Sequence, residues 1–184
     1  MLALTEGCSM DIQLMSLSGV LKMQPQVFLD ERGFFYESFS EPLLRQFGLP
    51  SCYVQDNHSF SKKGVLRGMH FQKGQAKLIN VIVGVIYDVF VDIRKDSSTF
   101  GRWEGVILDA RDKQLLFIPD GYAHGFYVIS DEAHLIYKVS QVYNPAEEAS
   151  FRYDDPYINI DWPEGEKILS IRDQGSPLFS EVIL

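Results

Sequence analysis

The chain has 184 residues, of which 46% are hydrophobic and 23% charged, a balance typical of a soluble globular protein with one sizeable core. Its formal net charge of -8 excludes the basic surface that a nucleic-acid partner would require. We therefore expect a single domain over residues 1–184, in which an anionic small molecule would need locally gathered positive side chains.

The segment 1–23 is mildly apolar but has neither a basic leader region nor an apolar run long enough to cross a membrane. We expect no signal peptide and no membrane partner. Met10 is an alternative start, which would make residues 1–9 an upstream extension. Cys8 and Cys52 are the only cysteines and neither lies in a CxxC pair, which argues against disulfides and thiolate metal sites and favours the cytoplasm.

One segment has the pattern of a helix. Residues 40–49 (SEPLLRQFGL) begin with Ser40, which can cap a helix, and carry Pro42 in the first turn. Gly48 stands where such a helix would end.

Short runs rich in β-branched and aromatic residues fill most of the remaining chain. From Val85 to Ile93 the odd positions are expected to share one face of a strand and the even positions the other. Further strands are expected in 103–110, 114–121, 124–130 and 133–140. This series predicts a mainly β fold, an antiparallel sandwich or barrel, followed at 164–184 by a loop with a short helix.

The run Val65–Gln72 (VLRGMHFQ) places Arg67 and His70 in a segment that otherwise resembles a buried strand. A histidine in such a strand is often a structural residue with a satisfied hydrogen bond. A regular strand would send these two side chains to opposite faces, and Gly68 between them can form a bulge that gives both the same direction. We predict that both face the interior of the β fold.

Several ordered blocks of the chain together resemble the dTDP-4-dehydrorhamnose 3,5-epimerase family over residues 27–177. The blocks are DERGFFYESF (30–39), VQDNHSFSKKGVLRGMHFQ (54–72), VDIRKDSSTFGRWEG (91–105), IPDGYAHGFYVISDEAHLIYK (118–138) and DDPYINIDWP (154–163). The resemblance implies a cupin-type jelly roll, a homodimer, and an isomerase of dTDP-rhamnose biosynthesis that uses no cofactor and no metal. Its substrate would be a dTDP-linked 4-keto-6-deoxy sugar, inverted at C3 and C5.

The resemblance also assigns roles in the chemistry. Protons at C3 and C5 are acidic because the C4 ketone stabilises the enolate, so inversion needs a base on one face and an acid on the other. His70 matches the base, Asp173 its partner, Lys77 the cation near the ketone oxygen and Tyr137 the acid. Taken singly, Asp173 would be a turn residue, Lys77 a solvated strand residue and Tyr137 a core tyrosine.

The substrate-binding residues implied by the resemblance include two arginines for the diphosphate, Arg32 and Arg67, because a guanidinium fork suits phosphate oxygens. Tyr143 matches a tyrosine that stacks on thymine, and Arg172 stands where relatives have lysine. The remaining implied contacts are Glu37, Gln55, Asp56, Asn57, His124 and Glu148. The connection from His70 to Lys77 is shorter than in most relatives, and Val85 stands where many relatives have glutamate.

Three alternatives remain open at this point. The first is a metal-dependent cupin enzyme, for which His70 and His124 would supply two ligands but no third is evident. The second is a single-centre epimerase or a 3,4-ketoisomerase, against which Tyr137 argues mildly. The third is a non-catalytic binding module, which would leave a base, its partner and an acid without a purpose.

Overall fold

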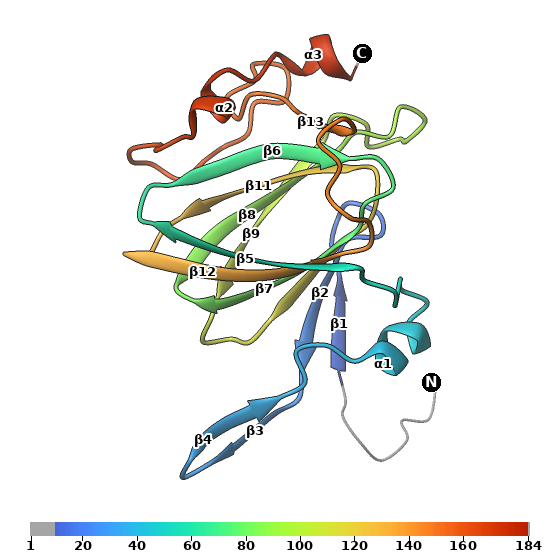
Figure 1. Ribbon diagram of the computed structural model, residues 1–184, viewed down its shortest axis with the longest axis vertical. Coiled ribbons are helices and arrows are strands. Elements are labelled where there is room, and N and C mark those ends of the chain that lie inside the picture. The colour runs from blue at the N-terminus through green and yellow to red at the C-terminus, as the bar shows by residue number, and fades with distance from the viewer. Residues whose placement is uncertain (1–9, 184) are drawn as a thin grey trace.

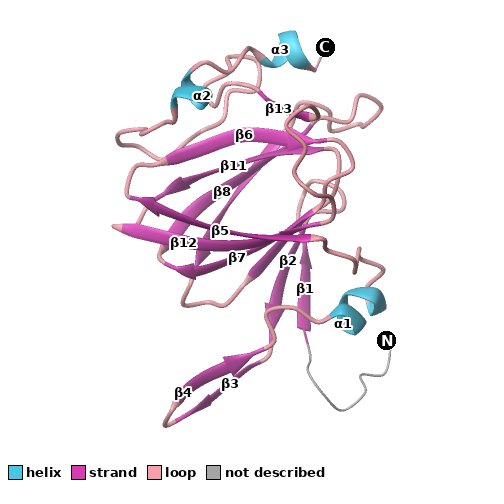
Figure 2. Ribbon diagram, viewed as in Figure 1, coloured by secondary structure: helices cyan, strands magenta, loops and turns pink. Residues whose placement is uncertain are grey.

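The computed structural model describes residues 10–183, so the expected extension at residues 1–9 lies outside the described part. Two antiparallel sheets face each other (Figures 1 and 2). From edge to edge, the six-stranded sheet contains β1 (Met10–Leu14), β2 (Leu21–Pro25), β10 (Leu115–Ile118), β7 (Lys77–Val83), β12 (Glu132–Val139) and β5 (Gln55–Lys62). The five-stranded sheet contains β13 (Glu148–Ser150), β6 (Leu66–Gln72), β11 (Tyr122–Val128), β8 (Val85–Asp92) and β9 (Trp103–Asp109).

The remaining elements lie outside these two sheets. A separate hairpin projects from the body and consists of β3 (Val27–Asp30) and β4 (Gly33–Tyr36) (Figure 1). The three helices are short: α1 (Glu41–Gln46), α2 (Ile171–Gln174) and α3 (Phe179–Val182). The predicted mainly β, cupin-type fold with few helices is confirmed.

Strand alternation decides which apolar side chains face which layer. Along β8, Ile86 and Phe90 point between the sheets and join the central core. Val89 and Val91 point to the outer face of the five-stranded sheet, where they pack in a second cluster with Phe179 of the C-terminal segment. The alternation predicted from Val85 onward is confirmed, and the C-terminal segment, which contains two short helices rather than one, covers this outer face.

Helix α1 lies where the sequence predicts it, with Pro42 in its first turn and Gly48, at a φ of 69°, just beyond its end. Ser40 occupies the N-cap position but its side chain forms no capping hydrogen bond, contrary to expectation. Leu44 anchors the helix by packing with Leu78 in a third cluster, on the outer face of the six-stranded sheet. None of the described helices is long and apolar enough to span a membrane.

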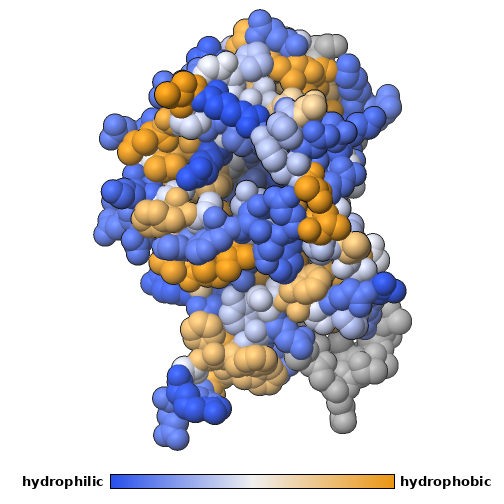
Figure 3. Space-filling model, viewed as in Figure 1, coloured by the Kyte–Doolittle hydropathy of each residue, from blue (hydrophilic) through white to orange (hydrophobic). Residues whose placement is uncertain are grey.

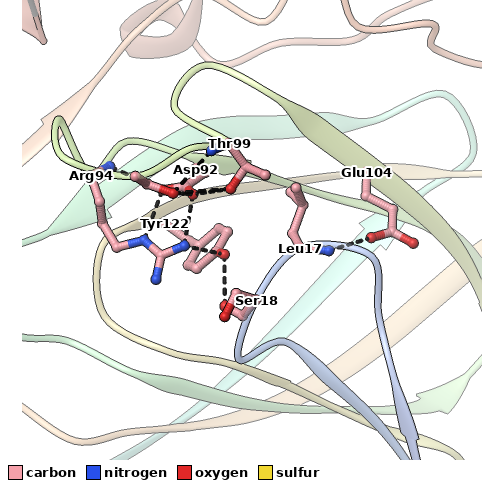
Figure 4. A network of polar contacts seen from close by, with 8 residues as sticks. Leu17, Ser18, Asp92, Arg94, Thr99, Glu104 and Tyr122 are labelled. Atoms are coloured by element: carbon pink, nitrogen blue, oxygen red, sulfur yellow. Dashed lines mark hydrogen bonds and ion pairs between the residues drawn. The ribbon is translucent and has the colours of Figure 1, made fainter.

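A buried carboxylate fixes the loop between β8 and β9 (Figure 4). Asp92 accepts hydrogen bonds from the guanidinium of Arg94 at 2.7 and 2.8 Å and from Thr99 Oγ1 at 2.6 Å. Burial raises the pKa of Asp92, but these donors outweigh it and hold the pKa well below its usual value. The hydroxyl of Tyr122 accepts a hydrogen bond from Arg94 and donates one to the carbonyl of Ser18 at 2.8 Å. These contacts connect the β8–β9 loop to the β1–β2 loop.

Candidate active site

A cavity between the two sheets has two adjoining lobes, and His70 and Tyr137 line both of them. The larger lobe has a volume of about 310 Å³ and the smaller of about 190 Å³. His70 comes from β6 in the five-stranded sheet, whereas Tyr137 comes from β12 in the six-stranded sheet. The two side chains therefore reach the same space from opposite walls.

The structure brings His70 and Asp173 together. Nε2 of His70 lies 2.6 Å from Oδ1 of Asp173, which is 3% exposed, while the histidine side chain is 30% exposed. When Nε2 donates to the carboxylate, Nδ1 is the ring nitrogen that can take up a proton. The pair thus has the arrangement of a base whose ring is oriented, and whose charged form is stabilised, by a carboxylate.

Ser170 holds Asp173 in place, a contact that sequence reasoning missed. Its Oγ accepts from the Asp173 backbone N–H at 3.0 Å and donates to Asp173 Oδ2 at 2.9 Å. Burial raises the pKa of Asp173, but hydrogen bonds with His70 and Ser170 outweigh it and leave the pKa below its usual value. A serine three positions before an aspartate, at the start of a short helix, was the sequence signal that could have predicted this contact.

Arg67 and His70 point to the same side of β6 because the strand is irregular between them. Arg67 pairs with Phe126 of β11 and His70 with His124, a shift in register that turns both side chains into the smaller lobe. Gly68 occupies the irregularity with a φ of 139°, and a Cβ there would lie 2.6 Å from the backbone of β11. The predicted bulge is confirmed, and only glycine fits its geometry.

On the six-stranded sheet, burial shifts the pKa values of Lys77 and Tyr137 in opposite directions. Lys77 on β7 is 8% exposed, and burial lowers its pKa to about 8, although Glu148 acts in the opposite direction. Burial raises the pKa of Tyr137, so its hydroxyl keeps its proton at neutral pH, even though Arg67 opposes the shift.

A second histidine–aspartate pair borders the smaller lobe, which His124 lines. His124 Nε2 is 2.9 Å from Oδ2 of Asp88, a fully buried carboxyl. Burial raises the pKa of Asp88 above its usual value, although His124 acts in the opposite direction. Its other oxygen, Oδ1, has no hydrogen-bond partner among the described residues. Asp88 was not among the predicted site residues, although its even-numbered position on β8 gives it the same strand face as Ile86 and Phe90, and the structure turns that face inward.

Most of the predicted binding residues also line the cavity. Gln55, Asn57 and Tyr143 line the larger lobe, together with Glu148. Arg172 lines the smaller lobe, and its guanidinium lies 2.6 Å from Oε2 of Glu148. The cavity therefore contains cationic, amide and aromatic side chains of the kinds that bind a nucleotide diphosphate.

Three predicted residues lie elsewhere in the described chain. Arg32 is at the tip of the β3–β4 hairpin, where it pairs with Asp30 at 2.5 Å. Asp56 faces the outer side of the six-stranded sheet, because it alternates with Gln55 and Asn57, and it pairs there with Lys138 at 2.7 Å. Glu37 follows the hairpin and lines neither lobe. Asp56 therefore lies outside this cavity.

Within residues 10–183, no three or more histidine, cysteine, aspartate or glutamate side chains are placed to share a metal ion. His70 and His124 each direct Nε2 at an aspartate instead. Such pairs are typical of proton transfer.

The facing sheets and the paired histidine between them define a cupin-type jelly-roll enzyme equipped for acid–base chemistry. Residues 14–181 match the model of the dTDP-4-dehydrorhamnose 3,5-epimerase family, and the chain belongs to this family.

Individual relatives agree with this assignment. The dTDP-4-dehydrorhamnose 3,5-epimerase of Salmonella typhimurium is 46% identical over 92% of this chain and 95% of its own length. The structure of an epimerase from Legionella pneumophila in complex with dTDP-4-keto-L-rhamnose superposes with a TM-score of 0.92 at 44% identity, covering 95% of each chain. A 3'-monoepimerase from Streptomyces bikiniensis in complex with dTDP-quinovose gives 0.85 at 36% identity, covering 90% of this chain and 86% of that one.

Proposed function

We propose that the protein inverts C3 and C5 of dTDP-4-dehydro-6-deoxy-D-glucose and so produces dTDP-4-dehydro-L-rhamnose. The observation that carries the proposal is the placement of His70 and Tyr137 on opposite sheets around one cavity. Inversion requires a proton to leave one face of the sugar and another to arrive on the other face. The C4 ketone already present makes both protons acidic, so proton transfer alone inverts each centre and no electron carrier is required.

The proposed reaction starts when Nδ1 of His70 removes the proton next to the C4 ketone. The C–H bond electrons form an enolate, and Asp173, 2.6 Å from Nε2, stabilises the imidazolium. Lys77, protonated below a pKa of about 8, balances the charge on the enolate oxygen. Tyr137 then donates its hydroxyl proton to the carbon from the opposite face.

For the nucleotide end we propose the groups already gathered in the cavity. Arg67 is oriented from β5, since Nε donates to Ser61 Oγ at 3.0 Å and the guanidinium to the carbonyl of Phe60 at 3.2 Å. In the proposed complex Arg67 faces the diphosphate, Tyr143 stacks on the thymine, and Gln55 and Asn57 contact the nucleoside. His124, Glu148 and Arg172 complete the substrate contacts.

We further propose a homodimer, since the β3–β4 hairpin exposes apolar side chains on both faces. Phe28 pairs with Phe35 on one face and Leu29 with Phe34 on the other, and Leu29 is 79% exposed. An isolated hairpin with two uncovered apolar faces has little stability in water. Figure 3 shows more apolar surface on the body beside the hairpin, over β7 and β12, where Ile82 is 38% exposed.

A second copy that covers the hairpin would also account for Arg32. β5 ends the six-stranded sheet, and no strand within residues 10–183 pairs with its outer edge. Gln55 and Asn57 of this strand line the cavity. A partner hairpin seated along this edge would bring Arg32, with Glu37 behind it, to the diphosphate end of the site. We propose that this dimer acts in the cytoplasm.

The proposed reaction is tested by incubating the protein with dTDP-4-dehydro-6-deoxy-D-glucose in heavy water and locating the deuterium in the product. Incorporation at both C3 and C5 with inversion of both is expected. Deuterium at C3 alone would identify a single-centre epimerase, which the similarity to the 3'-monoepimerase makes a specific second candidate. A product with its ketone moved from C4 to C3 would identify a ketoisomerase.

A further inference from the structure

One segment without regular secondary structure forms part of the cavity wall. The strap, residues 140–147, leaves β12 in the six-stranded sheet and reaches β13 in the five-stranded sheet (Figure 1). It carries Tyr143, which lines the larger lobe, and leads directly to Glu148. Three successive residues, 141 to 143, are exposed to solvent. Such a segment has few apolar contacts of its own and would be mobile if nothing else held it.

Glutamine side chains hold this strap from three directions. Gln75 Nε2 donates to the carbonyl of Gln141 at 3.1 Å. Gln72 Nε2 donates to the carbonyl of residue 142 at 3.0 Å, and its Oε1 accepts from the N–H of residue 144 at 2.9 Å. Gln55 Oε1 accepts from the N–H of Tyr143 at 2.9 Å. Four consecutive strap residues therefore each have one main-chain group bonded to a glutamine side chain.

The glutamines are themselves fixed in the framework. Gln72 and Gln75 are 4% and 9% exposed, and Gln55 donates to Asn57 Oδ1 at 2.7 Å. They come from the end of β6, the β6–β7 turn and β5, and therefore from both sheets. An amide is suited to this task because it can donate to a carbonyl and accept from an N–H at the same time, as Gln72 does.

We propose that Gln72 and Gln75, with Gln55, are positioning residues that order the strap before a ligand binds, so that the wall carrying Tyr143 is already formed. This inference rests on the proposed function, because it assigns Tyr143 to the base of the nucleotide. Ordering in advance removes an entropy cost from binding, and the apparent affinity falls in proportion to the fraction of molecules with the strap in place. The glutamines act on nucleotide affinity and not on proton transfer at the sugar.

The test compares the parent with Gln72→Met, which keeps the length of the side chain but removes both hydrogen bonds. We expect the Kd for dTDP and the KM for the sugar nucleotide to rise about tenfold, with kcat at saturation nearly retained. Amide hydrogen exchange at Asn144 should accelerate while exchange in β6 stays slow. Gln24→Met is the matched control. Gln24 lies on β2 and its side-chain amide donates a similar hydrogen bond to the carbonyl of Asp112 at 3.0 Å, so this variant should change none of these values.

Unchanged dTDP affinity in Gln72→Met, or a fall in kcat with KM unchanged, would overturn the proposal. If Gln72→Met does not fold, Gln75→Met removes a single bond and should give a smaller change in the same direction. If the parent itself does not bind dTDP, the proposed function fails. Exchange at Tyr143 and Asn144 then still decides whether the glutamines order the strap: acceleration in the variants supports ordering and unchanged exchange contradicts it.

Discussion

His70 on β6 and Tyr137 on β12 line one cavity from opposite sheets, which places an imidazole on one wall and a phenol on the other. The histidine is paired with an ionised aspartate, whereas the tyrosine is in surroundings that raise the pKa of its hydroxyl and keep it protonated. The difference in environment therefore separates the proton acceptor from the proton donor.

Asp173→Asn should lower kcat by on the order of a thousandfold, because a neutral amide cannot stabilise the imidazolium form of His70. Binding of dTDP should change little, since Asp173 acts on the sugar end. The measurement is turnover together with dTDP affinity. Asp154→Asn is the control: its pKa is also lowered, by Arg152, but this pair is exposed and lines neither lobe. Equal turnover of the two variants would remove Asp173 from the mechanism.

The fall of kcat/KM at basic pH should follow the deprotonation of Lys77. Because burial lowers its pKa to about 8, the cation needed at the enolate oxygen is present below that pH and lost above it. kcat/KM of the parent should therefore fall as the pH rises through 8. Lys77→Arg should be slower but without that fall, since a guanidinium stays protonated. An identical fall in the arginine variant would show that another group titrates.

Mixing two impaired variants tests whether Arg32 serves the partner's site. His70→Ala lacks the base, and Arg32→Ala should bind the sugar nucleotide weakly. In a mixed dimer, one site would combine an intact His70 with an intact Arg32 from the other copy. Random exchange of subunits should therefore restore about a quarter of parent activity at subsaturating substrate.

Activity in the mixture equal to the sum of the separate variants would contradict this arrangement, provided that subunits exchange. Mass measurement of differently tagged copies monitors that exchange. A monomer in solution at assay concentrations would also contradict the proposed dimer.

Gly68→Ala should destabilise the protein by about 2–3 kcal/mol, because the added Cβ would meet the β11 backbone and the residue needs a positive φ. The midpoint of denaturant unfolding measures the loss. Gly48→Ala also introduces a side chain at positive φ, but nothing lies within 4 Å of its Cβ, and it should cost about 1 kcal/mol. Similar losses at both positions would show that the close approach to β11 does not matter.

Much of the fold could be predicted because strand alternation is strongly marked in this chain. The alternation from Val85 puts Phe90 and Val89 on opposite faces, and the structure shows Phe90 in the central core and Val89 under the C-terminal segment. Ser40 shows the limit of such reasoning: its residue type favours capping, but whether the hydroxyl reaches a backbone N–H depends on a rotamer that packing decides.

The site could be predicted less completely, because contacts between distant segments are invisible in a local pattern. The pairing of His70 with Asp173 was expected from family resemblance, whereas the support from Ser170 and the pair of Asp88 with His124 were not. Alternation along β5 should have removed Asp56, which lies between two inward-facing positions. In the proposed dimer Arg32 meets the site of a second copy, and no pattern within one chain describes such a contact.

The most direct test of the account is the behaviour of Tyr137→Phe in heavy water. Abstraction by His70 should remain possible while reprotonation from the far face becomes slow, so that the enolate recovers a proton from the His70 side. The variant should therefore incorporate deuterium into the substrate faster than it forms inverted sugar, whereas the parent couples the two. A purely structural hydroxyl would cost about 1 kcal/mol of stability and reduce both rates together. Equal loss of exchange and inversion in a folded variant would contradict the assignment of Tyr137 as the donor.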